Sequence, residues 1–277
     1  MTQCSRYYFT SNLESMIGTE LVIQYSEQTK QIQGRGSIMK FNFIPTTIFA
    51  AVFSLAGGMA STDAQAAEPQ VVDVQFNKSY IPRGFDSNDN GQIVAEGTLP
   101  NTCYKPAQTE VVIDHAQKTV TLFAKARKYE GICLPVLVNY HRVIDLGVMN
   151  VGEYRVLQGS ANLGKLQIAA ATSSSADDFL YAPISQAYFE KVDQYHQVKI
   201  SGEFKNSCMK LVDVLFNIED DVIVLQPISE LEDGEACAEG TFPFESAVIL
   251  ENLPAGRYLL HIRSLNAKAV NSLVNAR

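Results

Sequence analysis

The sequence predicts an all-β protein: two tandem β-sandwich modules, each with one disulfide, preceded by a signal peptide. Three observations carry this prediction. Apolar residues alternate with polar ones, a set of landmarks recurs at a constant spacing, and four cysteines fall two per repeat. The chain has 277 residues, of which 46% are hydrophobic and 19% are charged. This composition is typical of a folded globular protein and is too apolar for a disordered one.

A period of two in the apolar residues predicts the strands. Apolar side chains alternate over residues 111–113 and 120–124 around a polar turn at 114–118, and again over 214–216 and 222–224 around a turn at 217–221. Further strands are predicted at 71–76, 92–97, 136–146, 153–157 and 166–170, and at 179–181, 197–202, 246–250 and 257–263. Many short strands separated by turns are typical of a β-sandwich. Helix is predicted only at 185–195 and 267–276.

An internal repeat divides the second part of the chain. Residues 97–105 read GTLPNTCYK and residues 202–210 read GEFKNSCMK, so Gly, Asn, Cys and Lys coincide in order. Further along, Leu146, Gly152 and Tyr154 match Leu250, Gly256 and Tyr258 at nearly the same spacing. We infer a tandem duplication, with one module at residues 67–171 and the other at 172–277.

The cysteines follow the repeat. Cys4 lies far upstream, and four cysteines permit three pairings. Because each copy should contain its own bond, the duplication selects Cys103–Cys133 and Cys208–Cys237. Such bonds persist in an oxidising compartment. Zinc binding is the alternative, but no CxxC and no nearby pair of histidines supports it.

Residues 39–66 have the pattern of a secretory signal peptide. Lys40 precedes an apolar run over 43–60, and Ala64-Gln65-Ala66 forms a small-x-small cleavage site. Pro45 and the two glycines at 57–58 interrupt the run, which favours cleavage over a membrane span in the mature protein. We expect residues 1–38 to lie upstream of a true start at Met39; a translated extension is the alternative. The predicted location is the periplasm or the extracellular medium.

The charge distribution disfavours a nucleic-acid partner. The net charge is −8, and most of the acidic excess lies in the second copy. The basic cluster Lys125, Arg127 and Lys128 is interpreted as the solvated end of a strand.

One segment suggests a family resemblance. Residues 250–260, LENLPAGRYLL, resemble the Leu-x-x-Leu-x-x-Gly-x-Tyr-x-Leu strand–turn–strand of secreted Ig-like and transthyretin-like modules of bacterial exported proteins, including carboxypeptidase-regulatory-like domains. Residues 146–156 contain a weaker version, with Arg155 at an apolar site. Gly152 and Gly256 would allow a tight turn, and Tyr154 and Tyr258 would pack at the sandwich edge. The resemblance implies an adhesive, spacer or binding module, since fold alone does not fix function.

A partial calcium loop precedes one predicted strand. Asp86, Asn88 and Asn90 occupy ligand positions 1, 3 and 5, and Gly91 occupies position 6. Position 12, normally Glu, is Gly97. An Asx-rich turn explains the same residues. Calcium is the only cofactor that the sequence suggests.

The functional expectation is an exported, non-enzymatic protein that binds an unknown protein or envelope component, or acts as a structural module. No nucleophile elbow of the Gly-x-Ser-x-Gly type is present. An enzyme or enzyme inhibitor with a site between the modules, using His141 and His196, is the second hypothesis. A calcium-dependent binding module is the third.

Overall fold

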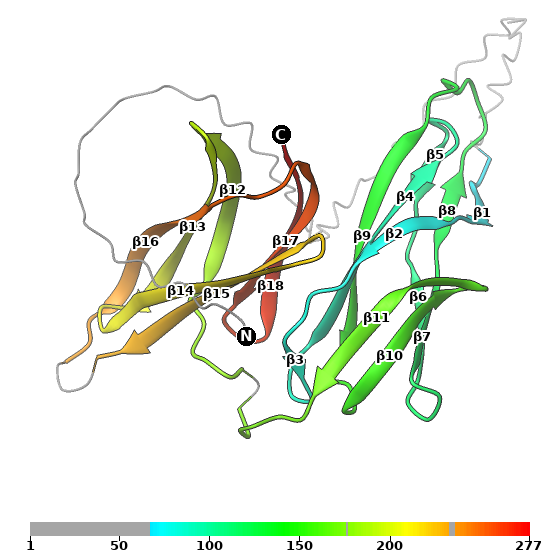
Figure 1. Cartoon of the computed structure of the whole chain (residues 1–277). Helices are drawn as coiled ribbons and strands as arrows, with labels where there is room; N and C mark the ends of the chain where they lie inside the picture. The colour runs from blue at the N-terminus through cyan, green and yellow to red at the C-terminus, as the bar shows by residue number, and fades with distance from the viewer. Residues whose placement is uncertain (1–66, 176, 233–235) are drawn as a thin grey trace, which may run out of the picture. The chain divides into compact units, whose positions relative to one another are not determined.

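The computed structural model describes residues 67–175, 177–232 and 236–277 (Figure 1). Every regular element in these ranges is a β-strand, so the all-β prediction is confirmed. The predicted signal peptide at 39–66 and the extension at 1–38 lie outside the described residues. Within the described ranges, no helix is long and apolar enough to cross a membrane.

The first module contains strands β1 to β11. Its sheets have the orders β2-β4-β9, β3-β11-β10-β7-β6 and β1-β8-β5. The strands are β1 (Gln70–Asp73), β2 (Phe76–Tyr80), β3 (Phe85–Asp86), β4 (Gly91–Leu99), β5 (Tyr104–Pro106), β6 (Glu110–Asp114), β7 (Thr119–Phe123), β8 (Lys125–Lys128), β9 (Val138–Gly147), β10 (Gly152–Gln158) and β11 (Ala161–Ala169).

The second module contains strands β12 to β18. Its sheets have the orders β12-β13-β16 and β14-β15-β17-β18. The strands are β12 (Ile184–Val192), β13 (Tyr195–Asn206), β14 (Met209–Glu219), β15 (Val222–Leu231), β16 (Glu239–Leu250), β17 (Gly256–Ser264) and β18 (Lys268–Ala276). The expected boundary at 171/172 falls between β11 and β12, but the module limits themselves stay a prediction.

Both modules contain the same unusual strand pairing. In the first, β7 and β10 run parallel, with Val120 opposite Val156. In the second, β15 and β17 run parallel, with Ile223 opposite Leu260. All other pairs in the β14-β15-β17-β18 sheet are antiparallel. The recurrence of a parallel pair at matched positions supports the inferred duplication.

Each module has its own apolar core, made by the inward-facing residues of alternating strands. The first core includes Ile93, Leu122 and Tyr154, and the second includes Val198, Ile223 and Leu260. Leu122 is one of the alternating residues that predicted the strands, whereas Ile223 lies between the alternating Val222 and Val224, because β15 is buried on both faces at this point.

The repeated glycines lie under aromatic rings. Gly97 pairs with Tyr140 across β4 and β9, and Gly202 pairs with Phe244 across β13 and β16. A Cβ at Gly97 would come within 2.7 Å of the Tyr140 ring and 2.5 Å of the Gln75 carbonyl oxygen. Both glycines therefore leave room for a cross-strand aromatic side chain.

The matched tyrosines make the same hydrogen bond. The Tyr154 hydroxyl donates to the Asn150 carbonyl and the Tyr258 hydroxyl to the Pro254 carbonyl, both at 3.0 Å. Gly152 has a φ of 146°, which favours glycine. Gly256 differs from the expectation, because it is not among the described residues with a left-handed φ; a Cβ there would lie 3.2 Å from the Tyr258 ring.

The two predicted helices are wrong. Residues 185–195 fall mainly in β12, which pairs with β13, and residues 267–276 fall in β18, which pairs with β17 along its length. Their Ala, Leu, Glu and Lys residues favour helix locally, but pairing with a neighbouring strand and burial of one face override that preference.

Candidate functional site

The loop between β3 and β4 is an Asx turn closed by its own carboxylates. Asp86 Oδ1 accepts hydrogen bonds from the backbone nitrogens of Asn88 at 2.8 Å and Asp89 at 3.2 Å. Asp89 accepts one from the Asp86 backbone nitrogen at 2.9 Å. Asn88 turns its amide nitrogen toward the Ser173 carbonyl at 2.7 Å. This geometry favours the Asx-turn interpretation, and calcium binding by Asp86, Asn88 and Asn90 stays a prediction.

No group of three or more His, Cys, Asp or Glu side chains suited to a metal ion occurs within residues 67–175, 177–232 and 236–277. The Asp86 loop instead faces a cation supplied by the protein itself.

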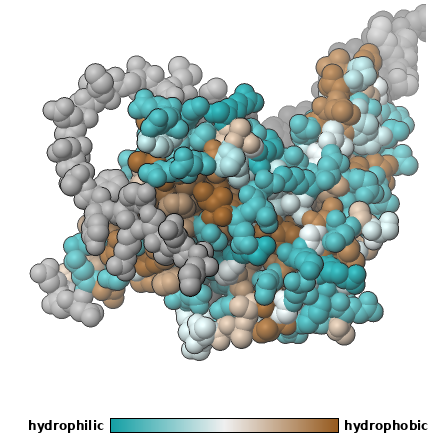
Figure 2. Space-filling view, in the orientation of Figure 1, coloured by the Kyte–Doolittle hydropathy of each residue, from teal (hydrophilic) through white to brown (hydrophobic). Residues whose placement is uncertain are grey.

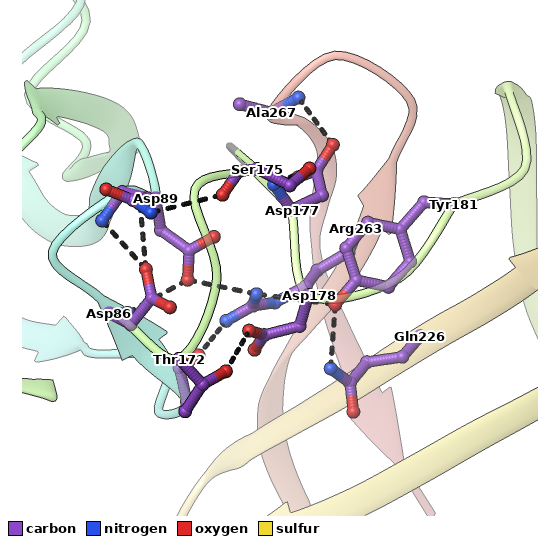
Figure 3. A network of polar contacts seen from close by, with 12 residues as sticks. Asp86, Asp89, Thr172, Ser175, Asp177, Asp178, Tyr181, Gln226, Arg263 and Ala267 are labelled. Atoms are coloured by element: carbon purple, nitrogen blue, oxygen red, sulfur yellow. Dashed lines mark hydrogen bonds and ion pairs between the residues drawn. The ribbon is translucent and has the colours of Figure 1, made fainter. Parts of the chain in front are cut away.

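Arg263 of β17 reaches from the second module into this loop (Figure 3). Its guanidinium lies 3.1 Å from Asp89 Oδ2, donates to the Gly84 carbonyl and stacks over the Phe85 ring at 5.2 Å. Both charged side chains are only 6% exposed. Burial raises the pKa of Asp89, and the charge of Arg263 opposes that rise. A charge buried this deeply is stable only when it is paired, so the contact fixes the two modules together.

Further contacts join the modules around this pair. An apolar cluster contains residues of both: Tyr80 and Val94 pack with Val222, Val224 and Leu259. Further ion pairs cross the same boundary. Arg257 lies 2.6 Å from Glu96, and Lys78 lies 2.5 Å from Asp221. Arg83 lies 2.7 Å from Glu219 and 3.7 Å from Asp220.

A small hollow lies beside Arg263. Its lining includes Phe85, Gln92, Asp177 and His261, and its volume of about 20 Å³ suits roughly one water molecule. His261 is fully buried, and Nδ1 lies 2.7 Å from Asn271 Oδ1. Burial lowers the pKa of His261 to about 4. The hollow is far smaller than a pocket for a drug-sized ligand.

The two histidines of the enzyme hypothesis lie on different modules. His141 is exposed on β9, opposite Glu96. His196 is buried on β13 and stacks on Phe189, with ring centroids 5.3 Å apart. Within the described residues, neither histidine is a hydrogen-bond or ring partner of the other.

Both predicted disulfides form, Cys103–Cys133 and Cys208–Cys237. Each fixes a loop, which we name the first stapled loop (residues 129–137, between β8 and β9) and the second stapled loop (residues 232–238, between β15 and β16). The disulfides are typical of an oxidising environment.

The described residues of the two stapled loops make matching backbone contacts. In the first, Leu134 N donates to Thr102 Oγ1 at 3.0 Å; in the second, Ala238 N donates to Ser207 Oγ at 3.0 Å. The residues that follow β8 and β15 also match, because Tyr129 N and Glu232 N each donate to the carbonyl of the first cysteine in their own module at 2.9 Å.

The side chains of the loops differ sharply. The first loop exposes Ile132 (103%), Leu134 (63%), Val136 (50%) and Leu137 (75%). At the matched positions the second copy has only small or weakly polar residues, all exposed: Ala236, Ala238, Gly240 and Thr241. Figure 2 shows hydrophobic surface at the end of the first module where β5 and β8 are labelled in Figure 1. The matching backbone contacts of the described loop residues therefore form without large apolar side chains.

The strands at the base of the first stapled loop are basic. Lys105 of β5 lies directly opposite Arg127 of β8, and both are exposed. Like charges placed opposite each other destabilise a sheet. At the corresponding place in the second copy Lys210 lies opposite Glu230, and its Nζ is 2.5 Å from Glu232. The basic pair, like the apolar loop, is a feature of the first copy alone.

The sequence interpretation missed both features. Arg263 and Asp89 are far apart in the chain, and nothing in the sequence links them. The first stapled loop could have been found by setting residues 132–137, ICLPVL, against residues 236–241, ACAEGT, in the repeat. The basic cluster lies at the end of β8, as expected: Arg127 and Lys128 are exposed beside the loop, while Lys125 pairs with Asp73 at 2.6 Å.

Comparison with known proteins supports the sandwich of the first module. A family model described as the ORF11 beta-sandwich domain matches residues 93–162. This range runs from β4 into β11 and contains the first disulfide, the first stapled loop and the Tyr154 turn. No curated protein and no solved structure matches the sequence significantly. The chain thus resembles a known family over one β-sandwich module.

Proposed function

We propose that the protein is an exported, non-enzymatic binding protein that makes contact through the first stapled loop. The observation that carries this proposal is the exposure of four large aliphatic side chains on a loop fixed by a disulfide. The described residues of the second loop make the matching backbone contacts without them, so these contacts do not explain their presence. Exposed apolar residues that gather in one place mark interaction sites, and a loop ordered in advance loses little entropy on binding.

The second module acts in this proposal as a rigid support. It is joined to the first module by Arg263, by the apolar cluster around Leu259 and by the further ion pairs of Lys78, Arg83 and Arg257. We further propose that the modules are Ig-like or transthyretin-like, which the strand–turn–strand at 250–260 supports.

Export to the periplasm or the medium is part of the proposal. It is supported by the two disulfides and by the signal pattern at 39–66. N-terminal sequencing of the native protein should give a mature chain that begins at Ala67. A mature terminus upstream of Met39 would contradict both export by this signal and the proposed start.

Fractionation of cells that express the protein tests the contact surface. We expect the wild-type protein to remain with the envelope fraction. A matched-loop variant, in which Ile132→Ala, Leu134→Ala, Val136→Gly and Leu137→Thr copy the second module, should be released. The control replaces two exposed valines elsewhere, Val112→Ala and Val148→Ala. Equal retention of all three proteins would overturn the proposal.

A further inference from the structure

We propose that the first stapled loop is a membrane-surface anchor, which inserts its apolar side chains into the interface of an anionic phospholipid bilayer. This inference rests on the proposed function and names its partner. Three features of the loop carry it: the form of the apolar surface, the charges at its base and the contrast with the second copy.

The apolar surface is a protrusion and not a pocket. Ile132 is as exposed as in an open chain, and Leu134 and Leu137 are more than half exposed. A protein partner would have to supply a cavity shaped for these side chains. The acyl boundary of a bilayer is fluid, so it accepts protruding apolar groups without a matched shape, and the binding strength follows the buried apolar area.

The residues at the base of the loop complement anionic headgroups. Lys105, Arg127 and Lys128 are exposed on β5 and β8, and β8 leads directly into the loop; Glu130 is the opposing charge within it. The spacing along an extended chain places Arg127 within about 17 Å of Ile132. Tyr129 lies between the basic and the apolar residues, where amphipathic rings occupy the membrane interface. Stable attachment commonly combines an apolar insertion with such a basic patch.

The loop is ordered before it binds. The hydrogen bond from Tyr129 N to the Cys103 carbonyl holds the start of the loop, and the Cys103–Cys133 bond and the hydrogen bond from Leu134 N to Thr102 Oγ1 hold its middle. Little conformational freedom is then lost when it enters the interface.

The second stapled loop lacks both the large apolar side chains of the first loop and the basic pair at the base of that loop. Its loop carries the same disulfide, but small side chains replace the aliphatic ones, and Glu232 and Glu239 lie exposed beside them. Anionic headgroups would repel this loop. The two copies therefore predict that only the first stapled loop faces the lipid.

A tryptophan placed in each loop tests this directly. The sequence contains no tryptophan, so a single substitution provides the only indole fluorescence. We expect the emission of Ile132→Trp to shift to the blue when vesicles of equal parts phosphatidylglycerol and phosphatidylcholine are added. Ala236→Trp in the second loop should not shift. A shift of both, or of neither, contradicts the proposed insertion.

Co-sedimentation of the oxidised mature protein with the same vesicles gives the affinity. The matched-loop variant should bind at least about tenfold more weakly, because it loses many buried CH₂ groups. Lys105→Gln, Arg127→Gln and Lys128→Gln together should weaken binding to the anionic vesicles and reduce its salt dependence. The Val112→Ala, Val148→Ala control should bind like the wild type, and melting curves should show that every variant is folded.

The outcomes separate this inference from the proposed function. If the wild-type protein stays with the envelope through the loop but binds the vesicles no better than the matched-loop variant, the partner is not the lipid, and only the membrane inference fails. If it associates with neither, both proposals fail.

Discussion

Arg263 is a charged side chain that folding has removed almost entirely from water. The charge is stabilised by the Asp89 carboxylate, the Gly84 carbonyl and the face of the Phe85 ring, which belong to the first module. Within its own module the guanidinium contacts Tyr181, whose hydroxyl lies 3.5 Å away. Because its carboxylate partner belongs to the first module, we expect the stability of the second module to depend on the first.

Replacement of Arg263 should be strongly destabilising. We expect Arg263→Ala to lower the free energy of unfolding by about 3–5 kcal/mol, because it leaves the Asp89 carboxylate buried without a partner. The matched control is Arg257→Ala, whose ion pair with Glu96 is partly exposed and is worth about 1 kcal/mol or less. Urea unfolding at neutral pH measures both. A similar decrease in the free energy of unfolding in the two variants would show that the Arg263–Asp89 pair contributes no more than a partly exposed ion pair.

His261 should make the protein less stable in mild acid. The unfolded chain binds a proton at His261 below the usual pKa of 6.5, whereas burial lowers the pKa in the folded protein to about 4. The folded state is therefore disfavoured as the pH falls from 6.5 to 4, by about 3 kcal/mol in total. Between pH 6.5 and 4, the free energy of unfolding should decrease less steeply in the His261→Gln variant than in the wild-type protein. An unchanged slope would mean that other groups cause the acid sensitivity.

At the scale of the strands, close approach of backbone and ring explains the repeated glycines. Gly202 lies so near the Pro183 carbonyl and the Phe244 ring that an added Cβ would come within 1.9 Å of the carbonyl oxygen. Backbone atoms give way much less easily than the end of a flexible side chain. The sheet β12-β13-β16 thus requires glycine at this position for steric reasons and not for a turn.

Gly202→Ala should therefore cost about 2–4 kcal/mol, near the upper end of single-substitution effects. Gly240→Ala is the control, because its nearest contact would be the Phe242 ring at 3.3 Å, on an exposed stretch of β16. Thermal melting of the two variants compares the positions. A small effect at Gly202 would imply that β12 shifts to make room.

The sequence predicted the strands well where local pattern and tertiary environment agree. Alternating apolar residues marked β7 and β15, and the repeat selected the correct disulfides. It failed for β12 and β18, where Ala, Leu and charged residues favour helix in isolation but neighbouring strands impose extended backbone. The Arg263–Asp89 pair could not be predicted, because it depends on how one module packs against the other. The apolar loop was visible in the sequence but gains its meaning only from the exposure of Ile132 and Leu134.

For the molecule as a whole, the modules share part of their core. Tyr80 and Val94 of the first module and Leu259 of the second are almost fully buried in one cluster. Together with the buried ion pair, this contact couples two sandwiches that the duplication could have left independent.

Calorimetry of the oxidised mature protein should therefore show one unfolding transition and not two. A cooperative transition requires that the loss of either module expose the shared cluster and the Arg263 charge. In Arg263→Ala the coupling weakens, and we expect the transition to broaden or to separate. Two resolved transitions in the wild-type protein would show that the modules unfold independently.

The matched loops have a consequence for engineering and for evolution. The backbone around the second cysteine of each module carries large aliphatic residues in one copy and small residues in the other, while the hydrogen bonds from Leu134 N and Ala238 N stay the same. Each module thus holds the loop by the same disulfide and backbone contacts, whatever side chains the loop carries. We infer that the residues around the second cysteine can change without loss of the fold, and we expect an exchange of the two segments to move the proposed contact surface to the second copy.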